Sequence, residues 1–233
     1  MEMSTRQQWL ANRLNVCTAM TFEELTELPL VVQCNMFFTW DGIDDESLLS
    51  SFRRISDAYS SGEISRDEAR NLLLRSARGN GRDDGTNGLR NLASTARLNL
   101  ILDQNAKMAR AISQFEGMHR PANLKMFPYV IYRASVGSNH PNPRHQQYDG
   151  MIIDKRDPWL HTHWPPSELG CNCDLENCSA KKAATLGNIK PMSDPGDVKV
   201  ESDSGFVFDP ASALVKTPDG YRAYTTDELR RFL

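Results

Sequence analysis

Apolar and polar residues follow a helical period through most of the first 87 residues. Between residues 44 and 59 the apolar positions recur every three or four residues, which is typical of a helix with one buried face. A short amphipathic helix is predicted for residues 4–15, and another begins after Thr21, where TFEEL has the order of a capping box. A further helix follows Ser65, which is placed as its N-cap. Residues 1–87 are therefore predicted to form a helical region built from hairpins.

The middle of the chain contains one ambiguous run, one loop and one long helix. Residues 30–40, LVVQCNMFFTW, are a short apolar run whose period separates helix from strand poorly, and we favour helix. Residues 79–88 are all glycine or polar and are expected to form a mobile loop. Residues 88–117 are predicted to be the longest helix, central to the core and ended by Gly117 and Pro121. Its expected buried stripe is Leu89, Leu92, Ala96, Leu100, Met108, Ile112 and Phe115, and Leu98, Ile101 and Leu102 are expected to widen the apolar face.

Beyond Pro121 the pattern changes to short β-type segments separated by prolines. Four strands are predicted, at residues 129–135, 151–154, 197–202 and 205–208, because these runs are rich in β-branched and aromatic residues. The chain is therefore predicted to be α+β, with an N-terminal helical half that includes the long central helix. The C-terminal half is expected to be a small antiparallel sheet with loops rich in proline and cysteine.

Charge and composition narrow the classes of function. The 233 residues carry a net charge of −3, so no overall basic field would draw the protein to nucleic acid. The N-terminus lacks the apolar run of a signal peptide, and no later run reaches the length of a membrane span. The five cysteines are an odd number, which argues against a disulfide framework. We expect a soluble protein, made in a cytoplasm, with reduced thiols.

Most of the candidate chemistry lies in residues 157–178, DPWLHTHWPPSELGCNCDLENC. Cys171, Cys173 and Cys178 are three soft ligands close together, and zinc takes four cysteine or histidine ligands in a tetrahedron. A fourth ligand would come from one of three histidines, His145, His161 or His163. The alternative is that the thiols are buried and only pack. The candidate zinc ligands that we retain are Cys171, Cys173, Cys178, His145 and His163.

Two catalytic interpretations of the same stretch are weaker. The HTH sequence, residues 161–163, would place two imidazoles on one side of an extended segment, as in some metal-dependent hydrolases. However, no carboxylate at ligand spacing completes the set, and the proline pair after Trp164 predicts a rigid turn. A cysteine nucleophile with a histidine base, such as Cys171 with His145, lacks a third orienting group in the sequence. We therefore expect the histidines to form hydrogen bonds and the two tryptophans to fill the core.

The loop before the strand predicted at residues 151–154 is interpreted as structural. Arg144 and His145 lie between prolines and could form a contact surface. We favour instead that Arg144 bridges backbone carbonyls and that His145 anchors the loop onto the cysteine-rich turn. Asp149 and Gly150 are expected to form the turn that opens the strand at residues 151–154.

Several motifs occur in an order that is familiar. The run RHQQYDGMIIDKRDPWLHTHWPPSELGCNC, residues 144–173, resembles the C-terminal signature of the phage Mu F-like minor head proteins, also called phage head morphogenesis proteins. Residues 97–109, RLNLILDQNAKMA, are similar to the helix that enters that domain, and YVIYRAS is similar to its first strand. GFVFDPASAL, residues 205–214, is similar to its closing motif. The resemblance covers about residues 88–215.

The resemblance implies a non-enzymatic minor head protein of a tailed phage or prophage, present in few copies and acting in head assembly or genome delivery. Its implied partners are the portal protein and the major capsid protein, with phage DNA contacted in some relatives and no membrane. It would be found in the phage head, and in the bacterial cytoplasm during assembly. No cofactor is implied, so zinc rests on the cysteines and histidines alone. The alternatives are a metal-dependent hydrolase or toxin, and a zinc-stabilised nucleic-acid-binding module.

The resemblance also divides the chain into regions, and some residues of this sequence differ from the family's motifs. The predicted regions are residues 1–87, the Mu F-like domain at residues 88–215, and a tail at residues 216–233 with one short helix. Asn172 replaces the basic residue usual between the two cysteines, which removes an expected basic contact. The remaining departures are the SEL before Gly170, Gln104 for threonine, and Asp209 and Ala211 for asparagine and glycine.

Overall fold

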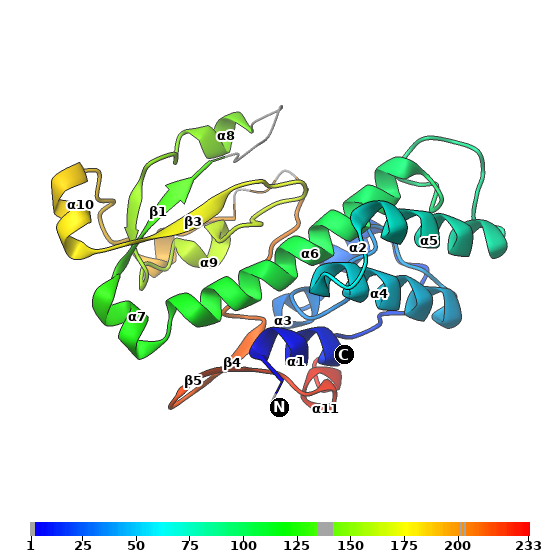
Figure 1. The fold of residues 1–233 in the computed structure, drawn as a ribbon, viewed down its shortest axis with the longest axis horizontal. Coiled ribbons are helices and arrows are strands. Elements are labelled where there is room, and N and C mark those ends of the chain that lie inside the picture. Colours follow the sequence, from blue (N-terminus) through cyan, green and yellow to red (C-terminus); the bar gives the residue numbers. More distant parts are fainter. Residues whose placement is uncertain (1–2, 135–141, 201, 203) are drawn as a thin grey trace. The chain divides into compact units, whose positions relative to one another are not determined.

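The computed structural model describes residues 3–134, 142–200, 202 and 204–233. These residues form two compact units, Met1–Arg110 with Tyr224–Leu233, and Ala111–Ala223, and one long helix contributes to both. The α+β class is confirmed (Figure 1). The helices are α1 (Thr5–Asn12), α2 (Phe22–Thr26), α3 (Leu30–Gln33), α4 (Glu46–Ser61), α5 (Arg66–Gly79), α6 (Thr95–Met118), α7 (Pro121–Met126), α8 (Pro143–Gln146), α9 (Leu160–His163), α10 (Ala180–Leu186), the 3-10 turn η1 (Pro195–Asp197) and α11 (Thr226–Arg230). The strands are β1 (Tyr129–Arg133), β2 (Ile152–Asp154), β3 (Asp174–Cys178), β4 (Leu214–Thr217) and β5 (Gly220–Ala223).

Helices α4 and α5 form the predicted hairpin, and Figure 1 shows them side by side. Asp45 caps α4 by accepting a hydrogen bond from the backbone N–H of Leu48 at 2.8 Å. The helix ends at Gly62, whose φ of 84° lies in the left-handed region that glycine enters without steric cost. Ser65 then caps α5 as predicted. The apolar faces of both helices are buried, including Leu48, Phe52 and Leu73.

Helix α6 begins seven residues later than predicted. Ser94 acts as its cap, because its hydroxyl accepts from the N–H of Arg97 at 3.1 Å and its carbonyl accepts from Leu98 at 3.0 Å. Leu92 is buried, but it lies in the turn before the helix. Burial of Leu98, Ile101 and Leu102 confirms the wider apolar face. Two residues of the expected stripe are not buried, because Ala96 is exposed and Leu100 is partly exposed.

The ambiguous run at residues 30–40 is helical only over Leu30–Gln33. After this helix the backbone pairs with the segment around Leu14: the N–H of Leu14 donates to Asn35 at 2.7 Å, and the N–H of Phe37 donates to Leu14 at 2.9 Å. The helix prediction is therefore wrong for the second half of the run. Tertiary pairing decides the conformation there, since a short apolar run is compatible with either structure.

A buried polar group connects α6 to this segment. Asn105 is 0 % exposed, and its Oδ1 accepts from the N–H of Phe38 at 3.1 Å and from Arg13 Nη1 at 2.6 Å. Its Nδ2 donates to the carbonyls of Phe38 and Ile101, both at 2.8 Å. The amide therefore uses all four of its hydrogen-bonding positions.

Arg13 is itself buried against aromatic rings. Its guanidinium carbon lies 4.7 Å from the ring centre of Trp9 and 5.4 Å from that of Phe37, and it forms an ion pair with Asp57. Burial lowers the pKa of Arg13 to about 10, against the opposing effect of Asp57. The guanidinium remains charged at neutral pH.

The C-terminal residues join the N-terminal unit. The capping box of Thr225 and Glu228 starts α11, which confirms the short helix predicted in the tail. The side-chain amide of Asn12 donates to the carbonyl of Tyr224 at 2.9 Å, and Leu229 is buried in a cluster with Leu14 and Leu25. Figure 1 accordingly shows α11 near α1. The predicted boundaries of the Mu F-like domain, at residues 88 and 216, were drawn from the resemblance in sequence and stay a prediction.

The second unit contains a three-stranded antiparallel sheet in the order β2-β1-β3. Val130 of the central strand faces Ile153 on one side and Asn177 on the other. The turn at Asp149 and Gly150 leads into β2 as predicted, and Gly150 has a φ of 75°. Strands β4 and β5 form a separate antiparallel pair.

Two of the four predicted strands are confirmed, at residues 129–135 and 151–154, although residue 135 lies outside the described residues. The described parts of residues 197–202 and residues 205–208 do not form strands. Val200 is 51 % exposed, whereas Phe206 and Phe208 are buried by loop packing. Three strands were not predicted, β3, β4 and β5. Of these, β3 has the polar sequence DLENC, whose β propensity is low. Its pairing with β1 determines its conformation.

Among the described residues, none of the helices combines the length and apolar character needed to cross a membrane.

Candidate functional site

Three of the five candidate ligands meet at one place in the second unit. The ligand atoms of His145, Cys171 and Cys173 all lie within 4.8 Å of one another. The Sγ of Cys173 is 3.2 Å from His145 Nδ1, and the Sγ of Cys171 is 3.7 Å from the same nitrogen. His145 and Cys171 are buried, and Cys173 is half-buried. We call these three residues the Cys2His cluster.

Short local structures position each member of the cluster. His145 lies on α8, where Asn142 is the N-cap and accepts from the N–H of Arg144 at 2.9 Å. Cys171 follows Gly170, whose φ of 74° allows the chain to turn so that the N–H of Cys171 donates to Glu168 at 3.2 Å. The expectation that His145 anchors its loop onto the cysteine-rich turn is confirmed.

A carboxylate that the sequence did not single out lies behind the histidine. Glu168 Oε1 is 3.5 Å from His145 Nε2, and the residue is only 8 % exposed. Arg144 Nη2 donates to Glu168 Oε2 at 3.0 Å, and the side-chain amide of Asn142 donates to Oε1. Arg144 was expected to bridge backbone carbonyls, and the structure gives it this carboxylate as a partner. No sequence signal marks Glu168, because its contact with residue 145 depends on the packing of two loops.

The cluster strongly perturbs its own ionisation. A hydrogen bond from Cys173 lowers the pKa of Cys171 well below its ordinary value, burial opposes this, and His145 adds to the lowering. Burial alone would lower the pKa of His145, but Cys171 and Glu168 raise it above its ordinary value. The site therefore favours a thiolate beside a protonated imidazole, and thiolate is the form of cysteine that binds metals and acts as a nucleophile.

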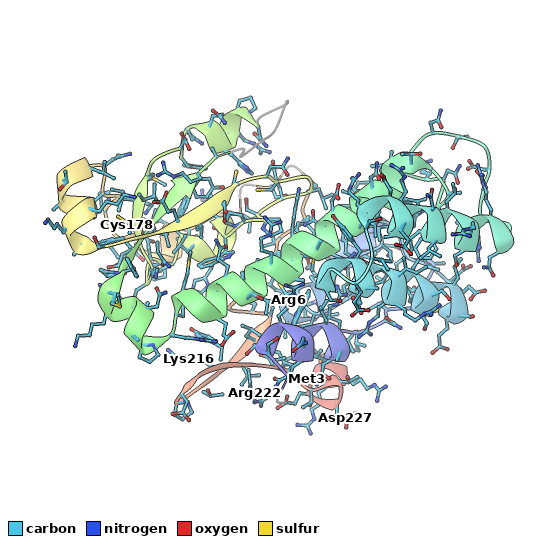
Figure 2. The ribbon with its side chains drawn as sticks, in the orientation of Figure 1. Met3, Arg6, Cys178, Lys216, Arg222 and Asp227 are labelled. Atoms are coloured by element: carbon cyan, nitrogen blue, oxygen red, sulfur yellow. The ribbon has the colours of Figure 1, made fainter. Side chains whose placement is uncertain are left out.

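Cys178 lies away from the cluster. It is the last residue of β3, and the five residues of this strand, Asp174–Cys178, separate it from Cys173 by about 16 Å. Its thiol is buried beside Ile131 and Ile152 and contacts the carbonyl of Ser179 at 3.5 Å. Figure 2 shows Cys178 at the end of β3 that leads into α10.

The HTH histidines lie in two further environments. They belong to α9, one helical turn that ends before the proline pair, and not to an extended segment or a rigid turn as expected. His163 stacks on Trp159 with ring centres 3.7 Å apart, and its Nδ1 is 3.1 Å from the carbonyl of Trp159. His161 Nδ1 is 3.1 Å from Asp209 Oδ2. Trp159 and Trp164 are both buried, as expected for core residues.

The same unit contains a cavity of about 510 Å³ that the sequence did not predict. Lys155 lies at its wall, and its Nζ donates to Met118, Asn123 and Asn177 at 3.1, 2.6 and 2.6 Å. Burial lowers the pKa of Lys155 to about 8. With three acceptors, the amine has a structural role, and the cavity presents mainly apolar walls. Its aromatic lining is Phe115, His119, Trp164 and Tyr221.

Fold and site together define an α+β chain with a small antiparallel sheet and a buried Cys2His cluster. Comparison with known proteins adds one relative: the protein named "Putative capsid assembly protein F" of Escherichia phage Mu is 26 % identical over 154 residues. The aligned part is 54 % of this chain and 34 % of the relative, so the chain spans about a third of that protein's length. No family model matches the chain, and no solved structure matches it. The chain is thus a distant relative of a phage capsid assembly protein.

Proposed function

We propose that the chain is a structural, non-enzymatic protein of phage head assembly, a minor head protein carried in the virion of a tailed phage or prophage. The observation that carries the proposal is the 26 % identity over 154 residues with capsid assembly protein F of phage Mu. The motifs at residues 97–109, 144–173 and 205–214 also support it, because they occur in the same order as the motifs of the family that they resemble.

The structural roles of these motif residues also support an architectural function. The side chain of Asp157 is 0 % exposed, and its carboxylate accepts from the N–H of Trp159 at 3.0 Å and pairs with Lys190 at 2.9 Å. Asn105 and Asp209 are likewise buried and hydrogen-bonded. Residues that hold loops and helices in place are expected in a protein whose task is to present a rigid surface to others.

The proposed partners are the portal protein and the major capsid protein, which the chain would meet in the host cytoplasm during assembly. Contact with phage DNA would have to be local, since the net charge is −3. A DNA contact of this kind would weaken steeply as salt increases, because each bound phosphate releases counterions.

The first test is affinity purification of the tagged chain from cells in which the phage or prophage is assembling, with mass spectrometry of the bound proteins. We expect portal and major capsid protein to be recovered together. An unrelated phage protein with the same tag is the control for abundance. Recovery of host enzymes without either head protein would contradict the proposal.

A second test is deletion of the gene, with complementation in trans. Loss of filled heads, counted by electron microscopy, is expected on deletion, and the wild-type chain should restore them. His161→Ala should restore them equally well, because the exposed imidazole has no catalytic role in this proposal. Filled heads at the normal number without the protein would exclude an assembly function. Failure of a His161→Ala variant that is folded and present at the wild-type level would favour the hydrolase alternative.

A further inference from the structure

We propose that His145, Cys171 and Cys173 bind one Zn²⁺ ion, which fastens α8 to the turn at residues 168–173. The proposal does not depend on the head-assembly function. The ion would stabilise a region that contains little regular secondary structure. Helix α8 has only four residues, and the turn at residues 168–173 is not paired with a strand.

The distances within the Cys2His cluster suit a tetrahedral ion. Zinc binds thiolate at about 2.3 Å and imidazole nitrogen at about 2.0–2.1 Å, so tetrahedral angles place sulfur and nitrogen about 3.6 Å apart. The two observed sulfur–nitrogen distances, 3.2 and 3.7 Å, lie on either side of this value. One small movement of Cys173 would therefore complete the arrangement.

The orientation of the imidazole also fits a metal ligand. Nδ1 faces both sulfurs, and Nε2 faces Glu168 Oε1 at 3.5 Å. Histidines that bind metals commonly direct the second ring nitrogen to a carboxylate, which fixes the tautomer and increases the basicity of the ligand. Glu168 is held in turn by Arg144 and Asn142. Glu168 is thus a positioning residue for His145.

The donor set distinguishes zinc from simple packing. A hydrogen bond between a thiol and an imidazole needs only one cysteine. Here the sulfurs of two cysteines, Cys171 and Cys173, both lie close to Nδ1 of His145. Soft thiolate and imidazole ligands select zinc over magnesium or calcium, which prefer oxygen. The three residues leave one position of the tetrahedron for a further ligand, on the side of Cys173, the half-buried member.

The decisive experiment measures metal in the full-length chain, purified under reducing conditions from zinc-supplemented cells. Mass spectrometry of the metal should find one zinc per chain, and Cys171→Ser and Cys173→Ser should lose it. The matched control is Cys178→Ser, which removes an equally buried thiol outside the cluster and should retain one zinc. A wild-type chain without zinc, or equal loss in Cys178→Ser, would overturn the proposal.

A second measurement needs no variant and covers the case in which the serine variants do not fold. The metal-free and zinc-loaded wild-type chains are treated with iodoacetamide, and alkylation is read peptide by peptide. Zinc should protect Cys171 and Cys173, while the exposed Cys17 reacts in both samples as an internal control. Equal alkylation of Cys171 with and without zinc would refute the site and favour a reactive cysteine instead.

Glu168→Gln tests the positioning role. The variant keeps the shape of the side chain but loses its charge, so it should still bind one zinc at saturation with an affinity that is about 10–100-fold lower. Unchanged affinity would remove Glu168 from the site while leaving the three ligands in place.

Discussion

Single buried polar residues help to select the folded conformation of this chain. Asn105 is the clearest case, because its side chain satisfies both the N–H and the carbonyl of Phe38 as well as Arg13. An apolar side chain of similar size would leave these groups buried without partners, and each such group costs about 1–3 kcal/mol. This explains why asparagine, a poor helix former, is found in the middle of α6.

We therefore expect Asn105→Leu to lower the free energy of unfolding by about 3 kcal/mol. Denaturant unfolding followed by circular dichroism measures the change. Asn71→Leu, on the exposed face of α5, is the matched control and should change stability by less than about 0.5 kcal/mol. Similar losses in both variants would show that the hydrogen bonds of Asn105 are not the cause.

The pair of His161 and Asp209 links α9 to the closing motif at residues 205–214. The hydrogen bond that His161 donates to the Asp209 carboxylate raises the pKa of His161 above its ordinary value of 6.5, although burial opposes this effect. Because the folded-state pKa is raised, the stability from this pair is fully present below pH 6.5. It is lost as the pH rises through the folded pKa.

Asp209→Asn should therefore lower the pKa of His161, measured from its NMR titration. The difference in stability between wild type and variant should be largest below pH 6.5 and should diminish at higher pH. His119 serves as an internal reference, since burial lowers its pKa and it should titrate below His161 in the wild type. An unchanged titration of His161 in the variant would contradict the assignment.

At the scale of elements, local signals predict the helices well where a cap and a periodic face agree. The helices after Thr21 and Ser65 begin where their caps were identified. Helix α6 was extended too far because Leu89 and Leu92 continue its apolar spacing, while the cap at Ser94 was overlooked. Strand β3 was missed because a polar sequence becomes a strand only through pairing with β1.

The cap offers a direct test of this account. Ser94→Ala should lower the free energy of unfolding by about 1 kcal/mol, because the N–H of Arg97 loses its acceptor at the helix start. Ser47→Ala, exposed in the first turn of α4, is the control and should have little effect. Equal behaviour of the two variants in denaturant unfolding would argue against Ser94 as the cap.

At the scale of the whole molecule, the proposed zinc ion would couple metal binding to folding. A ligand that binds only the folded state stabilises it by about 2.7 kcal/mol when its concentration is 100 times the dissociation constant. Removal of zinc by a chelator should therefore lower the melting temperature of the wild-type chain. The melting temperature of Cys173→Ser should not respond to the chelator, and a wild-type chain that is equally insensitive would indicate plain packing of the thiols.

The sequence alone determined the α+β class, the caps of several helices, the position of the central strand and the resemblance to phage head proteins. These features depend on residues close together in the chain, so their periodicity and spacing can be read directly. The tertiary structure decided which side chains meet. His145 reaches Cys171 and Cys173 across more than twenty residues, and Glu168 completes their surroundings, because two loops pack together. Cys178 is close to Cys173 in sequence but distant from the Cys2His cluster, because the chain between the two cysteines is extended as strand β3.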